Sequence, residues 1–365
     1  MDSRCDVCAP KKRSHHEKPV ERNLSREGII DLAFRAICLL NGLQVSGKQG
    51  VLGGLLLKLV WLGLSTLYAV TFILCKLREF RDENHELSLT RIVREINLFG
   101  FILTSLYGWF VFLTKQERIV RLLRTGNRRM IDLAMPCISM SPYILLAAIS
   151  CDWTASPVTV IQRVGLIHCM VIGAGFFLVY TDILENNRAL FQEISRSVDE
   201  LELSSVAEKK WLARDQIQKT NDLFAWILSA FLVQIPTTIA LTFTDLLRGV
   251  NFNAFGPYGF LGLFTLTLQL FELARRSTAC VSLRRETSMG FARIAETTDV
   301  ICAACQSKFI RILEFSEECD SLKVGHFPLS VANFLSFLIS SIACVAVILQ
   351  FDFRVMGALS KMASQ

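Results

Sequence analysis

Long apolar segments alternate with charged segments along the whole chain. Each apolar segment has enough residues to cross a hydrocarbon core of about 30 Å as an α-helix. One of them, 135–151, is at the short limit and contains Pro136 and Pro142. The pattern predicts an all-α, polytopic membrane protein with seven transmembrane helices. The predicted spans are 51–75, 96–113, 135–151, 158–183, 223–247, 257–274 and 328–351.

A weaker candidate segment, 29–45, precedes the seven spans. It carries Asp31, Arg35, Asn41 and Gln44. On a helix these side chains do not fall on one narrow stripe that a partner could cover. We therefore interpret the segment as an N-terminal membrane-associated helix that lies against the bilayer or dips partly into it. If it crossed the membrane instead, the chain would have eight spans and both termini inside.

Basic residues predict the orientation of the spans. Lys and Arg are concentrated in the N-terminal tail and in the connections 114–134, 184–222 and 275–327. Cytoplasmic loops carry an excess of these residues. We therefore expect the N-terminus to be cytoplasmic and the C-terminus extracellular, which is opposite to a rhodopsin-type receptor. The first 26 residues are polar and basic, so no cleavable signal peptide is expected.

The composition agrees with a membrane protein. Hydrophobic residues make up 52% of the 365 positions and charged residues only 20%, which is too apolar for a soluble protein of this length. The twelve cysteines are scattered through the spans and inner loops. They do not indicate an extracellular disulfide framework.

Two of the inner segments have a helical pattern of their own. Apolar residues recur at spacings near three and four in 184–219 and in 284–323. This predicts helices that continue below the membrane. We interpret their dense, balanced charges, such as Glu185 and Arg188, as a solvated helical face. A packed cytoplasmic layer that joins subunits would also explain the apolar stripes.

The last span ends in an uncharged amide beside an aromatic ring, at Gln350 and Phe351. An amide in lipid would be left without hydrogen-bond partners, so this pattern resembles a pore lining. On spacing alone, the preferred interpretation is an ordinary anchor helix whose last turn reaches the wet interface, where Gln and Phe are common.

The C-terminal part of the chain resembles the insect gustatory receptors, a branch of the insect chemoreceptor superfamily. The resemblance rests on a helical inner segment, then Gly-His-Phe-Pro-Leu-Ser at 325–330, then a last span that ends in Gln350-Phe351. The family's seventh span carries Thr-Tyr, five mostly apolar residues and Gln-Phe. This sequence keeps the Gln-Phe pair and the apolar spacer, but has Ala343 and Cys344 at the Thr and Tyr positions. It is therefore similar to a divergent member.

The resemblance implies a tetrameric, ligand-gated, non-selective cation channel in the plasma membrane of chemosensory neurons. Four seventh helices would line the pore, in a homo- or heterotetramer with related subunits. Gln350, Phe351, Val347 and Ile348 would form the gate, because apolar side chains can close a pore by dewetting and Gln amides can replace part of an ion's hydration.

The resemblance and the spans together divide the chain into four parts. Residues 1–28 form a cytoplasmic basic tail. Residues 29–274 hold the membrane-associated helix and the first six transmembrane helices, with a ligand pocket and inner-loop helices. Residues 275–327 form a cytoplasmic helical anchor. Residues 328–365 form the pore-lining seventh helix and a short extracellular tail.

The ligand implied by the resemblance is a small organic tastant, by default a bitter or otherwise aversive compound. Aromatic side chains in or beside the spans are candidates for its pocket, because such pockets are mostly apolar with a few polar groups. Anchoring at the membrane interface is the alternative role of each ring. The candidates are Trp153, Tyr258, Phe260, Tyr107, Trp109 and Tyr180.

Other chemistry finds little support. Cys5 and Cys8 precede two histidines, but the short polar tail offers no fold to hold zinc, so we expect no metal and no cofactor. No phosphate-binding loop or catalytic motif is present, and neither an enzyme nor a nucleic-acid partner is predicted. His168, deep in a span, is interpreted as a packing residue. Two alternatives to a channel remain: a seven-span receptor that signals through a cytoplasmic partner, and a membrane transporter.

Overall fold

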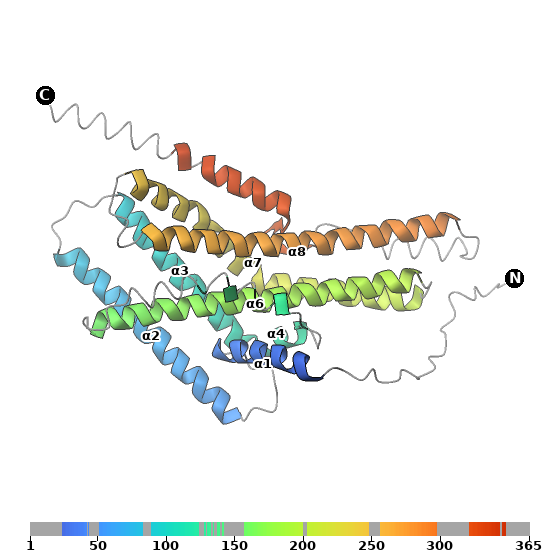
Figure 1. The fold of residues 1–365 in the computed structure, drawn as a ribbon, viewed down its shortest axis with the longest axis horizontal. Helices are drawn as coiled ribbons and strands as arrows, with labels where there is room; N and C mark the ends of the chain where they lie inside the picture. The colour runs from blue at the N-terminus through green and yellow to red at the C-terminus, as the bar shows by residue number, and fades with distance from the viewer. Residues whose placement is uncertain are drawn as a thin grey trace.

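A computed structural model describes residues 24–41, 43, 51–82, 89–123, 128, 130–132, 134, 137–138, 141, 157–199, 203–247, 256–297, 321–343 and 345–347. A further helix, named here the C-terminal helix, comprises residues 331–343 and 345–347. The other elements, shown in Figure 1, are α1 (Leu24–Leu40), α2 (Val51–Asp82), α3 (Leu89–Thr114), α4 (Gln116–Leu122), α6 (Pro157–Asp199), α7 (Leu203–Leu247), α8 (Gly256–Thr297), β1 (Lys323–Val324) and β2 (Phe327–Pro328).

Three long helices form the body of the molecule. α6, α7 and α8 have 43, 45 and 42 residues and pack against one another along the long axis (Figure 1). At a rise of 1.5 Å per residue each is about 65 Å long, roughly twice the thickness of a hydrocarbon core. α6 and α8 therefore continue well past the predicted spans 158–183 and 257–274. This confirms the predicted helical continuation as far as Asp199 and Thr297.

The predicted spans 51–75 and 96–113 lie within α2 and α3. Most of 135–151 and the end of 328–351 lie outside the described residues. Among the described helices, Glu208–Ala240 in α7 is long and apolar enough to cross a membrane, judged by length and composition. Ile102–Thr114 and Val331–Val347 are shorter apolar helices.

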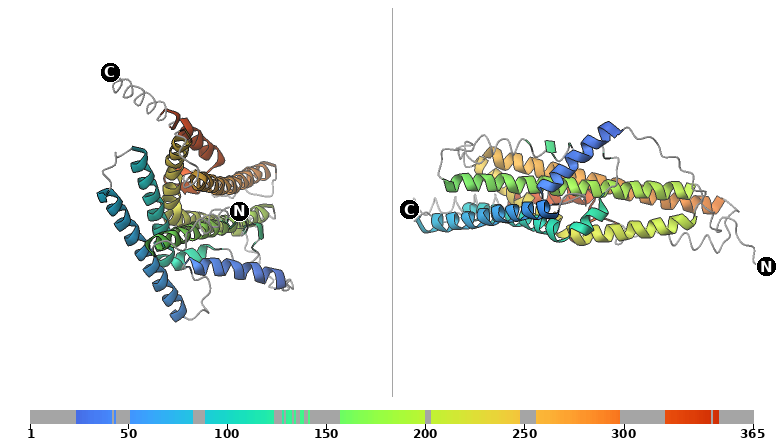
Figure 2. Two further views of the ribbon diagram at one scale, coloured as in Figure 1. Left: turned by 60° about the vertical axis from the view of Figure 1, so that its left-hand side comes forward. Right: turned by 90° about the horizontal axis from the view of Figure 1, so that it is seen from below.

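The other helices pack around this body on different sides (Figure 2). α3 contacts α7 and α6, and α2 lies beside α3 and α6. α8 lies on the far side of α6 and α7 from α2. α1 lies against α6. The C-terminal helix runs beside α7 and α8 (Figures 1 and 2).

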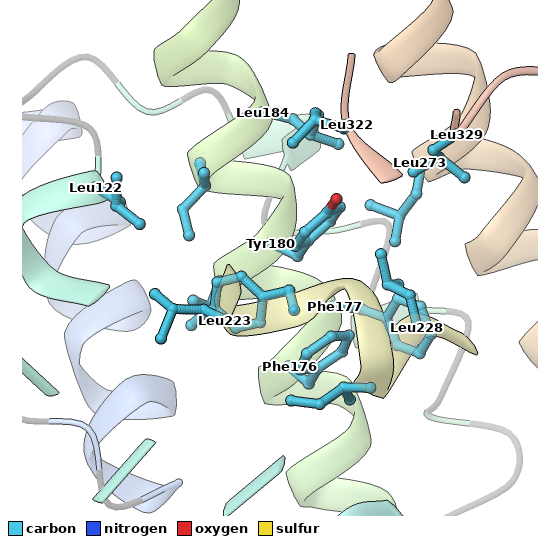
Figure 3. Packing of buried hydrophobic residues seen from close by; sticks show 14 of the residues in the cluster. Leu122, Phe176, Phe177, Tyr180, Leu184, Leu223, Leu228, Leu273, Leu322 and Leu329 are labelled. Carbon is cyan, nitrogen blue, oxygen red and sulfur yellow. The ribbon is translucent and has the colours of Figure 1, made fainter. Parts of the chain in front are cut away.

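The core is centred on aromatic rings of α6 and α7. Phe176 lies between Tyr180 and Phe231, with ring centroids 6.1 Å and 5.6 Å away, and Phe224 packs edge-on against both Phe176 and Tyr180 at 5.5 Å. Leucines of α4, α7, α8 and the segment around β1 and β2 close over these rings (Figure 3). Edge-to-face contacts add to the burial of large apolar surfaces, so this cluster fixes α6 against α7.

α1 lies against α6 with one face buried. Phe34 and Cys38 are buried, whereas Leu32 and Leu40 are 68% and 50% exposed. Asn41, directly after the helix, is fully buried beside Gly175 of α6. Asp31 and Asn41 therefore lie on the docked side of this segment, whereas Arg35 is exposed and Gln44 lies outside the described residues.

Candidate functional site

The chain turns into the C-terminal helix through a β-hairpin. β1 and β2 are antiparallel, with Val324 paired with Phe327 and Lys323 with Pro328. Gly325 lies in the turn with φ of 59°, a left-handed conformation that glycine adopts without steric cost. The Leu329 N–H donates to the Leu322 carbonyl oxygen at 2.6 Å and closes the base. The Gly-His-Phe-Pro-Leu-Ser stretch is thus a hairpin that continues directly into a helix.

α7 holds this hairpin through two residues one helical turn apart. The Asn221 amide donates to the Ser321 carbonyl oxygen at 3.0 Å and accepts from the Lys323 N–H at 2.8 Å. The Gly325 N–H donates to the Ala225 carbonyl oxygen at 3.1 Å. These bonds fix the turn on α7 at the start of the predicted span 223–247.

The first turn of the C-terminal helix is fixed to α8. The Val331 N–H donates to the Thr278 hydroxyl at 2.9 Å. Ser330 caps the helix, because its hydroxyl accepts from the Asn333 N–H at 3.2 Å. The Asn333 side chain donates back to the Pro328 carbonyl oxygen at 2.8 Å. Hairpin, cap and α8 contact together set the direction in which the helix leaves the body of the molecule.

The C-terminal helix has one covered face. Phe334, Ser341 and Val345 are buried, and the ring of Phe334 lies 6.2 Å from that of Phe271 on α8. Several apolar side chains elsewhere on this helix are exposed in the single chain, among exposed polar residues such as Ser336 and Ser340. These apolar side chains are Leu335, Ile339, Ile342 and Val347, which are 42%, 67%, 50% and 65% exposed.

The predicted gate residues fall at the end of this helix. Val347 is 65% exposed. Ile348, Gln350 and Phe351 lie outside the described residues.

Three of the candidate pocket residues differ in their exposure. Tyr180 is 1% exposed in the aromatic core, and Trp109 is 4% exposed on α3. Tyr107, also on α3, is 51% exposed. Tyr258 and Phe260 belong to α8, but their side chains lie outside the described part of the chain, as does Trp153.

Gln234 and His168 join different helices within the predicted spans. Gln234 of α7 donates to the Thr104 hydroxyl of α3 at 3.2 Å, and both side chains are buried. The His168 ring stacks on Trp61 of α2 with centroids 4.2 Å apart. This stacking confirms the packing role predicted for His168. Gln234 was not predicted, although a polar residue inside an apolar span is a signal for an interhelical hydrogen bond.

Comparison with solved structures shows the same arrangement in another protein, whereas the sequence matches no protein-family model and no curated protein sequence. The insect olfactory receptor OR5 from Machilis hrabei aligns with a TM-score of 0.62 over 89% of this chain and 98% of the receptor, at 11% identity. The chain has the fold of an insect olfactory receptor. The same receptor in complex with eugenol aligns with a TM-score of 0.59 at 12% identity over the same shares.

This fold agrees with the helical architecture that the resemblance implied. At 11% identity the likeness establishes the fold alone.

Proposed function

We propose that this chain is a subunit of a ligand-gated, non-selective cation channel, a gustatory receptor of chemosensory neurons that responds to small organic compounds. The observation that carries the proposal is the fold shared with the olfactory receptor OR5 over 98% of that receptor. Its gustatory assignment rests on the Gln350-Phe351 end of the last span.

The exposed apolar side chains of the C-terminal helix support a pore assembled from several chains. Leu335, Ile339, Ile342 and Val347 are exposed in the single chain. In a homo- or heterotetramer these side chains would surround a central axis, with Ile348, Gln350 and Phe351 completing the gate. Apolar side chains at a narrow point close such a pore by dewetting.

A small organic ligand is supported by the complex of the olfactory receptor OR5 with eugenol. On this chain, Trp153, Tyr258 and Phe260 near the predicted outer ends of the spans are the leading pocket candidates, and Tyr107, Trp109 and Tyr180 the secondary ones. A bitter or otherwise aversive compound is the default ligand class.

The hairpin offers a route from ligand to gate. α7 and α8 each hold the start of the C-terminal helix, through Asn221 and Thr278. A ligand that shifted α7 against α8 would therefore reorient that helix and spread the gate.

The test is whole-cell current from cells that express this chain, alone and with related subunits, during application of bitter compounds and sugars. Surface delivery is verified, and G-protein signalling is blocked. The proposal predicts a ligand-evoked cation current that persists under the block. A ligand response that the block abolishes would contradict a channel.

Two matched variants test the pore assignment. Gln350→Glu places a carboxylate ring at the gate and is expected to raise the permeability of divalent over monovalent cations. Gln218→Glu makes the same change on an exposed residue of α7 and is expected to leave permeability unchanged. Unaltered reversal potentials in the Gln350→Glu channel would contradict the gate.

A further inference from the structure

A single buried arginine joins α1 to α6. The guanidinium of Arg128 binds Asp182 of α6 through two hydrogen bonds of 2.9 Å and 3.2 Å. A third bond of 2.6 Å goes to Asp31 of α1. The guanidinium also lies over the ring of Phe34, with its central carbon 3.9 Å from the centroid. Arg128 comes from neither helix but from the connection that follows α4.

The two carboxylates share this arginine unequally. Asp182 is as buried as Arg128 itself, each 7% exposed, and the pair is bidentate. Asp31 is 28% exposed and makes one bond to Arg128. Asp31 also lies 3.7 Å from Arg35, which is itself half exposed. Water can therefore replace Arg128 at Asp31 far more easily than at Asp182.

Because of this asymmetry, undocking of α1 from α6 would break the bond of Arg128 to Asp31 and keep its bonds to Asp182. Arg128 would keep its bidentate partner, so no buried charge would lose its counter-ion. Burial by itself lowers the pKa of Arg128, but the carboxylates of Asp182 and Asp31 outweigh it and raise the pKa above its usual value. The guanidinium thus stays charged and paired in both arrangements.

A second cluster, one turn along α6, does not involve α1. Arg276 of α8 binds Glu185 of α6 and Asp132 at 2.7 Å each, and Glu272 of its own helix at 2.8 Å. These bonds tie α8, α6 and the residues after Arg128 to one another. Release of α1 would leave this cluster intact.

In the described residues, the buried apolar side chains of α1 are Phe34 and Cys38, followed by Leu43 after the helix, and Ile37 is partly buried beside them. Asn41 adds a steric contact at Gly175.

From these contacts we propose that α1 is a detachable helix, latched to the bundle by Asp31 on Arg128, and that it can undock while α6, α7 and α8 stay packed. The latch is a conformational device built into the fold: whatever weakens the contact of Asp31 with Arg128 frees the N-terminal helix. It does not depend on the proposed channel function.

Cys38 and Cys280 report on the two regions separately. Cys38 of α1 is fully buried, and Cys280 of α8 is 4% exposed. Burial raises the pKa of the Cys280 thiol to about 11, so it reacts slowly while the bundle is packed. Trypsin places the two thiols in separate peptides, 36–48 and 277–284, each with one cysteine. Mass spectrometry can therefore measure both thiols in one sample of the full chain.

The experiment compares alkylation by N-ethylmaleimide in the wild-type chain, Asp31→Asn and Asp215→Asn. Loss of a charge-assisted hydrogen bond shifts an equilibrium by about tenfold, and labelling of a transiently opened site follows that equilibrium. Asp31→Asn is thus expected to label Cys38 about tenfold faster with Cys280 unchanged. Asp215→Asn breaks an exposed pair with Lys219 of the same 2.6 Å length and should change neither thiol.

Three results would overturn the latch. Cys38 labelling could stay at the wild-type rate in Asp31→Asn, or rise equally in Asp215→Asn. Both thiols could also become reactive together, which would show that α1 does not detach from a packed bundle.

Raised salt offers a test that needs no variant. Screening weakens the partly exposed Asp31 contact more than the buried Asp182 pair. Cys38 of the wild-type chain should therefore label faster as salt rises, with Cys280 constant. A Cys38 rate independent of salt would also contradict the latch.

Discussion

Asn41 at the end of α1 occupies the space beside Gly175 of α6. A β-carbon at position 175 would overlap the Asn41 amide group. Asn41 is fully buried and donates to the Ile37 carbonyl oxygen at 2.8 Å, so its side chain cannot simply turn away. Glycine at this point on α6 is what lets the end of α1 approach so closely.

Gly175→Ala should therefore destabilise the protein. The added methyl group displaces Asn41 from its hydrogen bond, at a cost of about 1–3 kcal/mol. Gly63→Ala is the control, because a β-carbon there meets no atom within 4 Å. The measurement is the thermal unfolding midpoint of the purified protein. A Gly175→Ala midpoint no lower than that of Gly63→Ala would contradict the steric argument, and Asn41→Ala should restore part of the loss.

Replacement of Asn187 and of Asn221 by leucine should have different effects on the stability of the protein. Asn187 is 1% exposed, and neither polar atom of its side chain has a hydrogen-bond partner among the described residues. Asn221 uses both atoms to hold the hairpin. Asn187→Leu is expected to leave the unfolding midpoint unchanged or raise it. Asn221→Leu should cost about 1–3 kcal/mol by leaving backbone groups unpaired. Equal effects in the two variants would refute this assignment.

Arg276 and Arg275 are neighbours in sequence, but we expect them to contribute very differently to stability. Arg276 is 8% exposed among three carboxylates, whereas Arg275 is 57% exposed and pairs with Glu272. Arg276→Met leaves buried charges unpaired and should cost about 3–5 kcal/mol. Arg275→Met should stay within about 1 kcal/mol.

Two measurements compare the Arg276→Met and Arg275→Met variants. They are the fraction of monodisperse protein after size-exclusion chromatography and the thermal unfolding midpoint of that fraction. Adding Glu185→Gln to Arg276→Met should recover some stability, since one unpaired carboxylate is removed. No recovery, or similar losses in the two arginine variants, would speak against a buried cluster.

Gly325→Val tests whether the hairpin couples α7 to the gate. Valine at a left-handed φ of 59° costs about 1–2 kcal/mol, and its β-carbon would lie 3.1 Å from the Ser229 hydroxyl oxygen. Asn tolerates this backbone conformation better, so Gly325→Asn should have a smaller effect. In the proposed channel, Gly325→Val should raise the ligand concentration for half-maximal current without altering single-channel conductance. A changed conductance with unchanged ligand sensitivity would place the hairpin outside this coupling.

Helical periodicity predicted the long helices, because the spacing of apolar residues depends on local geometry alone. The partners of individual polar side chains were not predictable in this way. Glu185 was interpreted as part of a solvated face, yet it is 11% exposed and binds Arg276, which is 91 positions away. The solvated interpretation is thus wrong for Glu185, although it holds for Glu193 and Arg196, which are exposed.

The candidate site was predictable in outline only. Ser330 before an apolar run is a local signal for a helix start, and the structure places it at the cap of the C-terminal helix. Asn221 and Thr278 carry no such signal, since their partners are backbone groups 53 to 102 positions away. Tyr180 shows the same limit, because its aromatic sequence neighbourhood does not reveal that Phe224 of α7 packs edge-on against it.

The arginine clusters also bear on the axial position of α6 within the bundle. A helix of 43 residues with a long apolar stripe could slide by one turn, about 5.4 Å, and still cover the hydrocarbon. Asp182 and Glu185, at the end of the predicted span 158–183, bind arginines that come from other parts of the chain. A shift of one turn against these parts would break both pairs. The two clusters therefore fix the axial register of α6 within the bundle.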